Sequence, residues 1–276
     1  MFIDDNLITQ FKKYLRSEFL SEGTIDCYVR SVRAFCLGIG IGGINKEFFE
    51  GLKASGLDLS TLSRHIFAIK KFGEWQGLDL KFVKCKKKRF SNPDYLEFES
   101  VEAIRRLPIF TLQNLRDRAL FEFLLNTGCR ISEVLRLKRK DLAKEMDVIG
   151  KGNKLRTIFL GNAFGWVSRY NSERKDFSDL LFVSQHGKVW GRGNAYNAIK
   201  RLGKLADYNK SLHPHLLRHT YITYMVRAGV DVRTIQELCG HEDIETTLRY
   251  VAVDKKQKVW ASQVFKNLIS QRCKVL

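Results

Sequence analysis

The first part of the chain repeats apolar residues at the three- and four-residue spacing of amphipathic helices. One run covers residues 7–15, and a stricter run covers residues 25–36. A shorter run spans residues 48–52, and a longer one extends from Ser60, taken as its N-cap, to Phe72. The pattern predicts a small helical bundle over residues 1 to about 80.

A basic segment then interrupts this pattern and ends in Asn92-Pro93, a pair that disfavours helix. Its candidate DNA-binding residues are Lys86, Lys87, Lys88 and Arg89. Such a run forms either a solvated loop or a contact with a nucleic-acid backbone, and both alternatives stay open. We expect a domain over residues 1–83, a linker over 84–94 and a second domain over 95–276.

Helical patterns dominate the second part of the chain, beginning near Val101 and continuing through a thickly apolar run over residues 115–125. Two short strand-like runs, 148–149 and 157–160, bracket Gly150-Lys151-Gly152-Asn153-Lys154. Glycine and asparagine accept the positive φ angles of tight hairpins, so a β-hairpin with lysines at its tip is expected. Residues 180–183 suggest one more strand. The predicted fold class is mainly α with a small β-sheet.

Composition indicates folded domains and a polyanionic partner. The 276 residues suit two domains, and 44% of them are hydrophobic while 3 are proline. Lysine and arginine number 48 against 30 acidic residues, a net charge of +18 that favours binding to nucleic acid through its phosphates. Ribosomal and chromatin proteins are basic too, so charge alone specifies no chemistry.

Neither the cysteines nor the hydrophobic runs indicate a metal site or a membrane segment. The 6 cysteines are scattered, with no Cys-x-x-Cys pair and no histidine cluster at zinc spacing. The N-terminus lacks the basic and apolar regions of a signal peptide, and no run approaches the ~20 apolar residues of a membrane span. We therefore expect a soluble cytoplasmic protein that uses no cofactor.

Two local patterns in the first half of the second domain carry candidate chemistry. Arg130 follows Gly128 at the end of an apolar run and precedes a helix near Ser132. It could form a surface ion pair with Glu133 or grip a phosphate with its planar fork. Lysines at the hairpin tip are ordinarily just exposed, but a rigidly held lysine such as Lys151 could protonate a leaving oxygen.

Two more patterns follow. His215 and Arg218 lie three residues apart after Pro214, so they share one face at a helix start, a place that suits an anion. Farther on, Gly240 ends a predicted helix, His241 follows it, and Tyr250 lies nine residues later. Taken alone, each histidine and the tyrosine is more typical of a packed core than of a reactive site.

The order of these blocks resembles that of the tyrosine recombinases of the phage integrase and Xer type, over most of residues 95–260. The resemblance implies a helical core-binding (SAM-like) domain followed by an α+β catalytic domain. It also implies that Tyr250 is the nucleophile, that Arg130 and Arg218 bind the scissile phosphate, and that Lys151 is the general acid. The same resemblance places His215 and His241 beside the phosphate, and Lys154 joins the basic linker among the candidate DNA contacts.

As a member of that family, the chain would cleave and rejoin duplex DNA through a 3′-phosphotyrosine without metal or ATP, exchanging strands through a Holliday junction. The resemblance implies a tetramer on two DNA sites, formed from free monomers or weak dimers, with an accessory protein left open. A C-terminal helix over residues 259–269 would dock on a neighbouring protomer or fold back on its own core.

Three other functions compete with this interpretation. Within the family, the compact length favours Xer-like resolution of chromosome or plasmid dimers over integration and excision of a mobile element. A type IB topoisomerase-like enzyme would use the same groups to relax DNA without a specific site. A plain DNA-binding regulator would share the positive charge and never form a covalent adduct.

Overall fold

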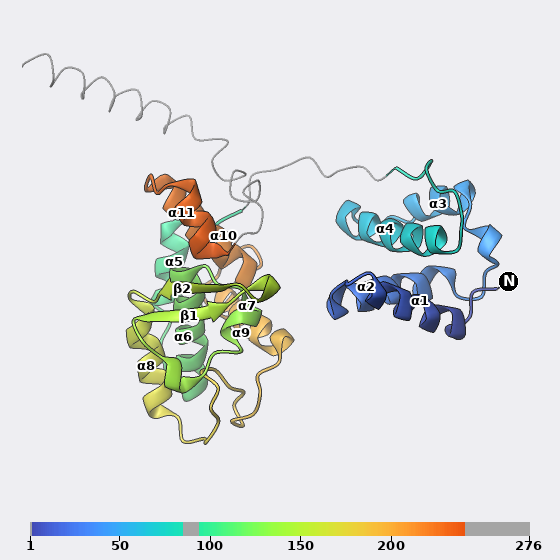
Figure 1. Cartoon of the computed structure of the whole chain (residues 1–276). Helices are drawn as coiled ribbons and strands as arrows, with labels where there is room; N and C mark the ends of the chain where they lie inside the picture. The colour runs from blue at the N-terminus through green and yellow to red at the C-terminus, as the bar shows by residue number, and fades with distance from the viewer. Residues whose placement is uncertain (1, 85–93, 241–276) are drawn as a thin grey trace, which may run out of the picture. The chain divides into compact units, whose positions relative to one another are not determined.

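The chain forms two compact units, Met1–Phe90 and Ser91–Leu276 (Figure 1). The computed structural model describes residues 2–84 and 94–240, with the side chain of Lys151 left out of that description. Each unit has its own hydrophobic core.

The first unit is the predicted helical bundle, and the structure confirms its helices. They are α1 (Asp5–Ser17), α2 (Glu22–Cys36), α3 (Lys46–Lys53) and α4 (Leu59–Trp75), with a 3-10 turn at Ile41–Gly43. Phe11 and Phe72 meet edge to face in its core, with ring centroids 5.0 Å apart. The predicted N-cap of α4 was wrong: Asp58 caps the helix instead of Ser60, because its carboxylate accepts the amides of Ser60 and Thr61.

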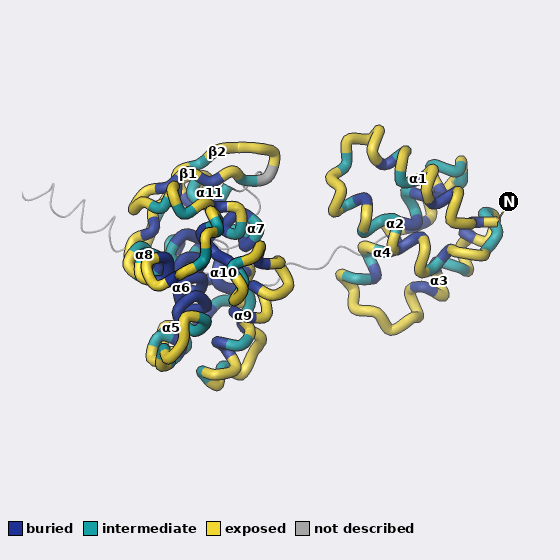
Figure 2. Tube along the Cα trace, turned by 90° about the horizontal axis from the view of Figure 1, so that it is seen from below, coloured by how far each residue is buried: buried dark blue, intermediate teal, exposed yellow. Residues whose placement is uncertain are grey.

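The second unit is built around α6 (Leu112–Thr127), whose residues are buried along most of its length (Figure 2). Helices α8, α9 and α10 and strand β2 all contact it. The helices of this unit are α5 (Phe98–Arg105), α6, α7 (Ile131–Val134), α8 (Ala163–Glu173), α9 (Arg192–Leu205), α10 (Pro214–Arg227) and α11 (Val232–Cys239), with a 3-10 turn at Arg139–Asp141. A smaller apolar cluster of Ile222, Val226, Ile235 and Cys239 joins α10 to α11.

The predicted hairpin is present as antiparallel β1 (Glu145–Ile149) and β2 (Leu155–Phe159). Its loop contains a 3-10 turn at Lys151–Asn153, in which Gly152 and Asn153 have φ angles of 70° and 62°. The amide of Gly150 donates to the carbonyl of Lys154 at 2.8 Å and closes the loop. The structure thereby confirms a mainly α fold with a small sheet.

The additional strand expected at residues 180–183 is wrong. Within the described residues, this segment makes only isolated bridges, Lys138 to Leu180 and Val183 to Val189. The buried guanidinium of Arg174 donates to the carbonyls of Leu180 and Leu181, at 2.7 and 2.9 Å. Those carbonyls are therefore occupied by a side chain, and the apolar run reflects burial in the core.

Candidate active site

The turn that carries Arg130 depends on a glycine. Gly128 ends α6 in the left-handed region with φ 61°, and a Cβ there would lie 2.5 Å from the ring of Tyr221. Arg130 follows as the N-cap of α7, and its amide donates to the Glu133 carboxylate at 2.9 Å. The predicted turn is confirmed, and it fixes the backbone of Arg130 at a helix start.

Arg218 is buried on α10, with 4% of its surface exposed. The helix begins at Pro214, as predicted, and His213 caps it by accepting the Leu216 amide on Nδ1 at 3.0 Å. Arg218 donates from Nη1 to the carbonyl of Gly128 at 2.6 Å and from Nη2 to the carbonyl of Cys239 at 2.7 Å. Its guanidinium therefore joins the end of α6 to the end of α11.

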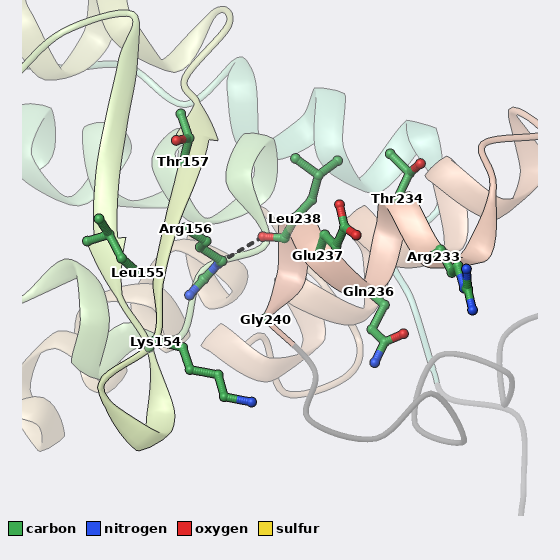
Figure 3. A pocket seen from close by; sticks show the side chains of 11 residues that line it. Lys154, Leu155, Arg156, Thr157, Arg233, Thr234, Gln236, Glu237, Leu238 and Gly240 are labelled. Atoms are coloured by element: carbon green, nitrogen blue, oxygen red, sulfur yellow. Dashed lines mark hydrogen bonds between the residues drawn. The ribbon is translucent and has the colours of Figure 1, made fainter.

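Three arginines bind the C-terminal end of α11. Gly240 caps that helix, as predicted, and its φ of 63° lies in the left-handed region. Arg156 on β2 donates to the carbonyl of Leu238 at 2.9 Å, as Figure 3 shows, and Arg218 donates to Cys239. Arg130 donates to the carbonyl of Gly240 at 3.2 Å. Unpaired carbonyls and the helix dipole make this end negative, which favours guanidinium groups around it.

Glu133 is the carboxylate that joins two of these arginines. Its side chain is 5% exposed, and it pairs with Arg130 through Oε1 at 3.1 Å and with Arg156 through Oε2 at 2.7 Å. Burial raises the pKa of Glu133, but hydrogen bonds from Arg156 and from Arg130 outweigh it and leave the pKa lowered. The ion pair considered for Arg130 is thus real, although it is largely buried rather than on the surface.

A pocket of about 690 Å³ lies between the hairpin and α11 (Figure 3). The hairpin contributes residues 150 and 154–157 to its walls, and α11 contributes residues 233, 234 and 236–238. Lys154 lines this pocket and is exposed. The backbone of Lys151 lies at the hairpin loop, two residues from the end of β1.

The histidines of α10 are held neutral near neutral pH. Shielding of the His215 ring from water lowers its pKa, and the positive charges of Arg218 and Arg130 add to that effect, although the residue as a whole is exposed. Burial also lowers the pKa of His219, to about 4. His215 is therefore a proton acceptor within electrostatic reach of both phosphate-binding candidates.

Several predicted residues lie outside the described residues. They are His241, Tyr250, Lys86, Lys87, Lys88 and Arg89, and the C-terminal segment 259–269 lies outside as well. Of the predicted catalytic set, the described structure brings together Arg130, His215 and Arg218. Across the described ranges, no group of three His, Cys, Asp or Glu side chains could hold a metal ion. No described helix is long and apolar enough to cross a membrane.

Arg156 was missed in the sequence analysis. It occupies an inward position of β2, one alternation before the buried Ile158, and its side chain is 9% exposed. An arginine on the inner face of a half-buried strand requires buried partners. The alternation of outward and inward positions along β2 was the signal in the sequence. It could not identify the partners of Arg156, because Glu133 and Leu238 lie 23 and 82 residues away along the chain.

Comparison with known proteins places these residues in a wider context. The model of the phage integrase family matches residues 94–257. Tyrosine recombinase XerD of Staphylococcus haemolyticus is 30% identical over 283 residues, which cover 92% of this chain and 96% of that protein. Tyrosine recombinase XerA of Pyrococcus horikoshii is 31% identical, covering 92% of this chain and 91% of that protein. A post-cleavage complex of the XerH recombinase with its palindromic difH substrate has a similar fold, with a TM-score of 0.71 and 21% identity over 88% of this chain and 80% of that one.

Proposed function

The chain belongs to the phage integrase family, and on that premise we propose that it is an Xer-like tyrosine recombinase that cleaves and rejoins DNA at a specific site. The observation that carries the proposal is the convergence of Arg130 and Arg218 on the backbone around Gly240, just before the segment with Tyr250. The XerD and XerA relatives are 30% and 31% identical over alignments that cover 92% of this chain, which supports the Xer-like role.

Arg130 and Arg218 are proposed to bind the scissile phosphate. Bonds to described acceptors use two of the five N–H groups of each guanidinium, so both arginines retain donors for an anion. These bonds also hold each fork in place before DNA binds. Attack on a phosphodiester adds negative charge to its non-bridging oxygens, and preorganised guanidinium groups stabilise that charge.

Tyr250 is proposed as the nucleophile. Its phenolic oxygen forms a bond to phosphorus while the bond from phosphorus to the 5′-oxygen breaks, leaving a 3′-phosphotyrosine and a 5′-hydroxyl. A phenol pKa near ~10 makes the neutral group a poor nucleophile, so positive charge around it must favour the phenolate as it forms. Neutral His215 accepts the phenolic proton, and His241 completes the contacts to the phosphate.

Lys151 is proposed to donate the proton that the 5′-oxygen takes as it leaves. The phosphotyrosine conserves the energy of the broken bond, so rejoining needs neither ATP nor a metal ion. Changing Lys151 to Ala should slow cleavage of ordinary DNA by about 10²–10⁴-fold yet spare a substrate with sulfur in place of that oxygen, since a thiolate leaves without a proton. Equal losses of cleavage rate on both substrates would contradict this role. The matched control is Lys154→Ala, which removes the other lysine of the hairpin.

The rest of the chain is proposed to hold the DNA. The first unit would act as the core-binding domain, and the basic linker with Lys154 would follow the phosphate backbone. Four protomers on two sites would exchange strands in pairs, with residues 259–269 docked between neighbours.

The decisive experiment uses a nicked suicide substrate that carries the recombination site, recovered first by binding selection. Wild type and Tyr250→Phe are incubated with it and separated by denaturing electrophoresis. A covalent protein–DNA band from wild type alone is expected. Bound DNA without a band, even with candidate partner recombinases added, would favour a DNA-binding regulator, and relaxation of plasmids lacking the site would favour a topoisomerase-like enzyme.

A further inference from the structure

Arg156 lies among the proposed phosphate-binding groups without any assigned role. Its guanidinium contacts three separate elements: the carbonyl of Leu238 on α11, the carboxylate of Glu133 on α7, and the sulfur of Cys129, which is 3.5 Å from Nη2. With 9% of its side chain exposed, it is more deeply buried than Arg130, which is 28% exposed. A cation this far from solvent needs a compensating function or a compensating charge.

The charged groups nearest to Arg156 show what compensates for the burial of its guanidinium. Within the described part of the chain, Glu133 is the carboxylate that Arg130 and Arg156 bind, and its charge also acts on Arg218. Burial raises the pKa values of the neighbouring thiols, to about 11 for Cys239, so they add no negative charge. Without Arg156, the Glu133 carboxylate would pair with Arg130 alone. That pairing would cancel most of the positive charge that Arg130 presents to an incoming phosphate.

The position of Arg156 is also tightly bounded. Its Nη1 has no hydrogen-bond partner among the described residues. A Cβ built on Gly150 or on Gly240 would lie 3.0 Å from that nitrogen, so the guanidinium passes between the hairpin and the end of α11. The same side chain therefore joins the strand leading from the lysine loop to the helix end that Arg130 and Arg218 also bind.

We propose that Arg156 is a positioning residue of the recombination reaction. It neutralises Glu133 and fixes the end of α11, so that Arg130 and Arg218 keep their orientation and positive charge for the scissile phosphate. This inference rests on the proposed function, since it assigns a part in the cleavage that the two arginines support. Arg156 itself acts through Glu133 and the α11 backbone.

A double-mutant cycle tests this role. Wild type, Arg156→Met, Glu133→Gln and the double variant are compared by single-turnover cleavage of the suicide substrate at saturating DNA. The Arg156→Met variant should cleave DNA about 10²-fold more slowly, because the Glu133 carboxylate then competes with the scissile phosphate for Arg130. Adding Glu133→Gln should restore at least about tenfold of that loss, since the competing charge is gone. Arg169→Met, an exposed change on α8 at a residue that does not line this pocket, is the control and should cleave like wild type.

Several outcomes would overturn the inference. One is cleavage by Arg156→Met at the wild-type rate, and another is a double variant as slow as the product of the two single losses. The second result would mean that Arg156 does not act through Glu133. Thermal melting and DNA affinity are measured for each variant, so that a loss of stability or of binding is recognised. If the Met variant does not fold, Arg156→Gln, which keeps a donor for the Leu238 carbonyl, takes its place in the cycle. Failure of wild type to form any covalent product would refute the proposed function instead.

Discussion

Arg118 and Arg218 both bury a guanidinium against the C-terminal end of a helix in the second unit. Arg118 donates to the carbonyls of Ile104 and Arg105 at the end of α5, each at 2.9 Å. Arg218 donates to Cys239 at the end of α11 and to Gly128 at the end of α6. The local chemistry is the same in both places, because helix ends leave carbonyls that need donors.

The two places differ in charge balance. Around Arg118, two arginines pair with two carboxylates, as Arg105 and Arg118 share Glu122 and Arg105 also binds Glu102. Around Arg218, Arg130 and Arg156 share Glu133, whose charge also acts on Arg218 without a direct bond. Counted over the described residues, the charges of the first network balance, whereas the second has an excess of positive charge. The proposed anion site is therefore distinguished by its unbalanced charge rather than by a buried arginine as such.

The largest expected effect comes from breaking the unbalanced set. Changing Arg218 to Gln removes a preorganised cation from the phosphate, so single-turnover cleavage should fall by about 10²–10³-fold or more. Cleavage of the suicide substrate at saturating DNA measures this loss. A residual rate within about tenfold of wild type would place the phosphate away from Arg218.

Breaking the neutral network should instead affect stability. Changing Arg118 to Gln leaves Glu122 with Arg105 alone, and loss of a buried partner should lower the free energy of unfolding by about 3–5 kcal/mol. Chemical denaturation measures that decrease. The cleavage rate per folded molecule should stay within about twofold of wild type. A loss of rate as large as that of Arg218→Gln would mean that the two networks do not differ in their role in cleavage.

His219, next to Arg218 on α10, should make stability depend on pH. Burial first, and then the nearby histidines and Arg218, lower its pKa to about 4, whereas an unfolded histidine titrates near 6.5. The unfolded chain takes up this proton first, so the stabilisation is complete above about pH 6.5 and is lost as pH falls toward 4. The loss should be on the order of 2–3 kcal/mol.

Denaturation of wild type and His219→Gln between these pH values measures the difference. The variant should show a shallower pH slope, because the titrating imidazole is gone. His186→Gln, a change in an exposed turn, controls for removing an imidazole elsewhere. Parallel slopes for wild type and His219→Gln would show that His219 does not carry the effect.

The smallest effect is expected at the hairpin tip. Lys154 is exposed and contributes charge without being part of the buried arginine set. Changing it to Ala should weaken DNA binding about equally on all sequences and reduce the slope of log affinity against log salt by about 1. Binding titrations at several salt concentrations measure that slope, and an unchanged slope would remove Lys154 from the DNA interface.

What the sequence determined by itself was local. Apolar spacing located the helices of the first unit, and the glycines at 128 and 240 end their helices as expected, both in the left-handed region. Pro214 marked the start of α10, and the Gly-Lys-Gly-Asn-Lys run made the hairpin. Each of these features depends on residues within a few positions of one another, so their physical cause is present in the sequence itself.

Only the tertiary structure decided how these pieces share charge. The apolar run at 180–183 predicts a strand, since the sequence shows that these residues are buried but not that Arg174 binds the carbonyls of Leu180 and Leu181. Arg130, Arg156 and Arg218 come from three different elements, and each binds one of three consecutive carbonyls at the end of α11. Which guanidinium reaches which carbonyl depends on how β2, α7 and α10 pack around that helix, and no local pattern encodes those long-range distances.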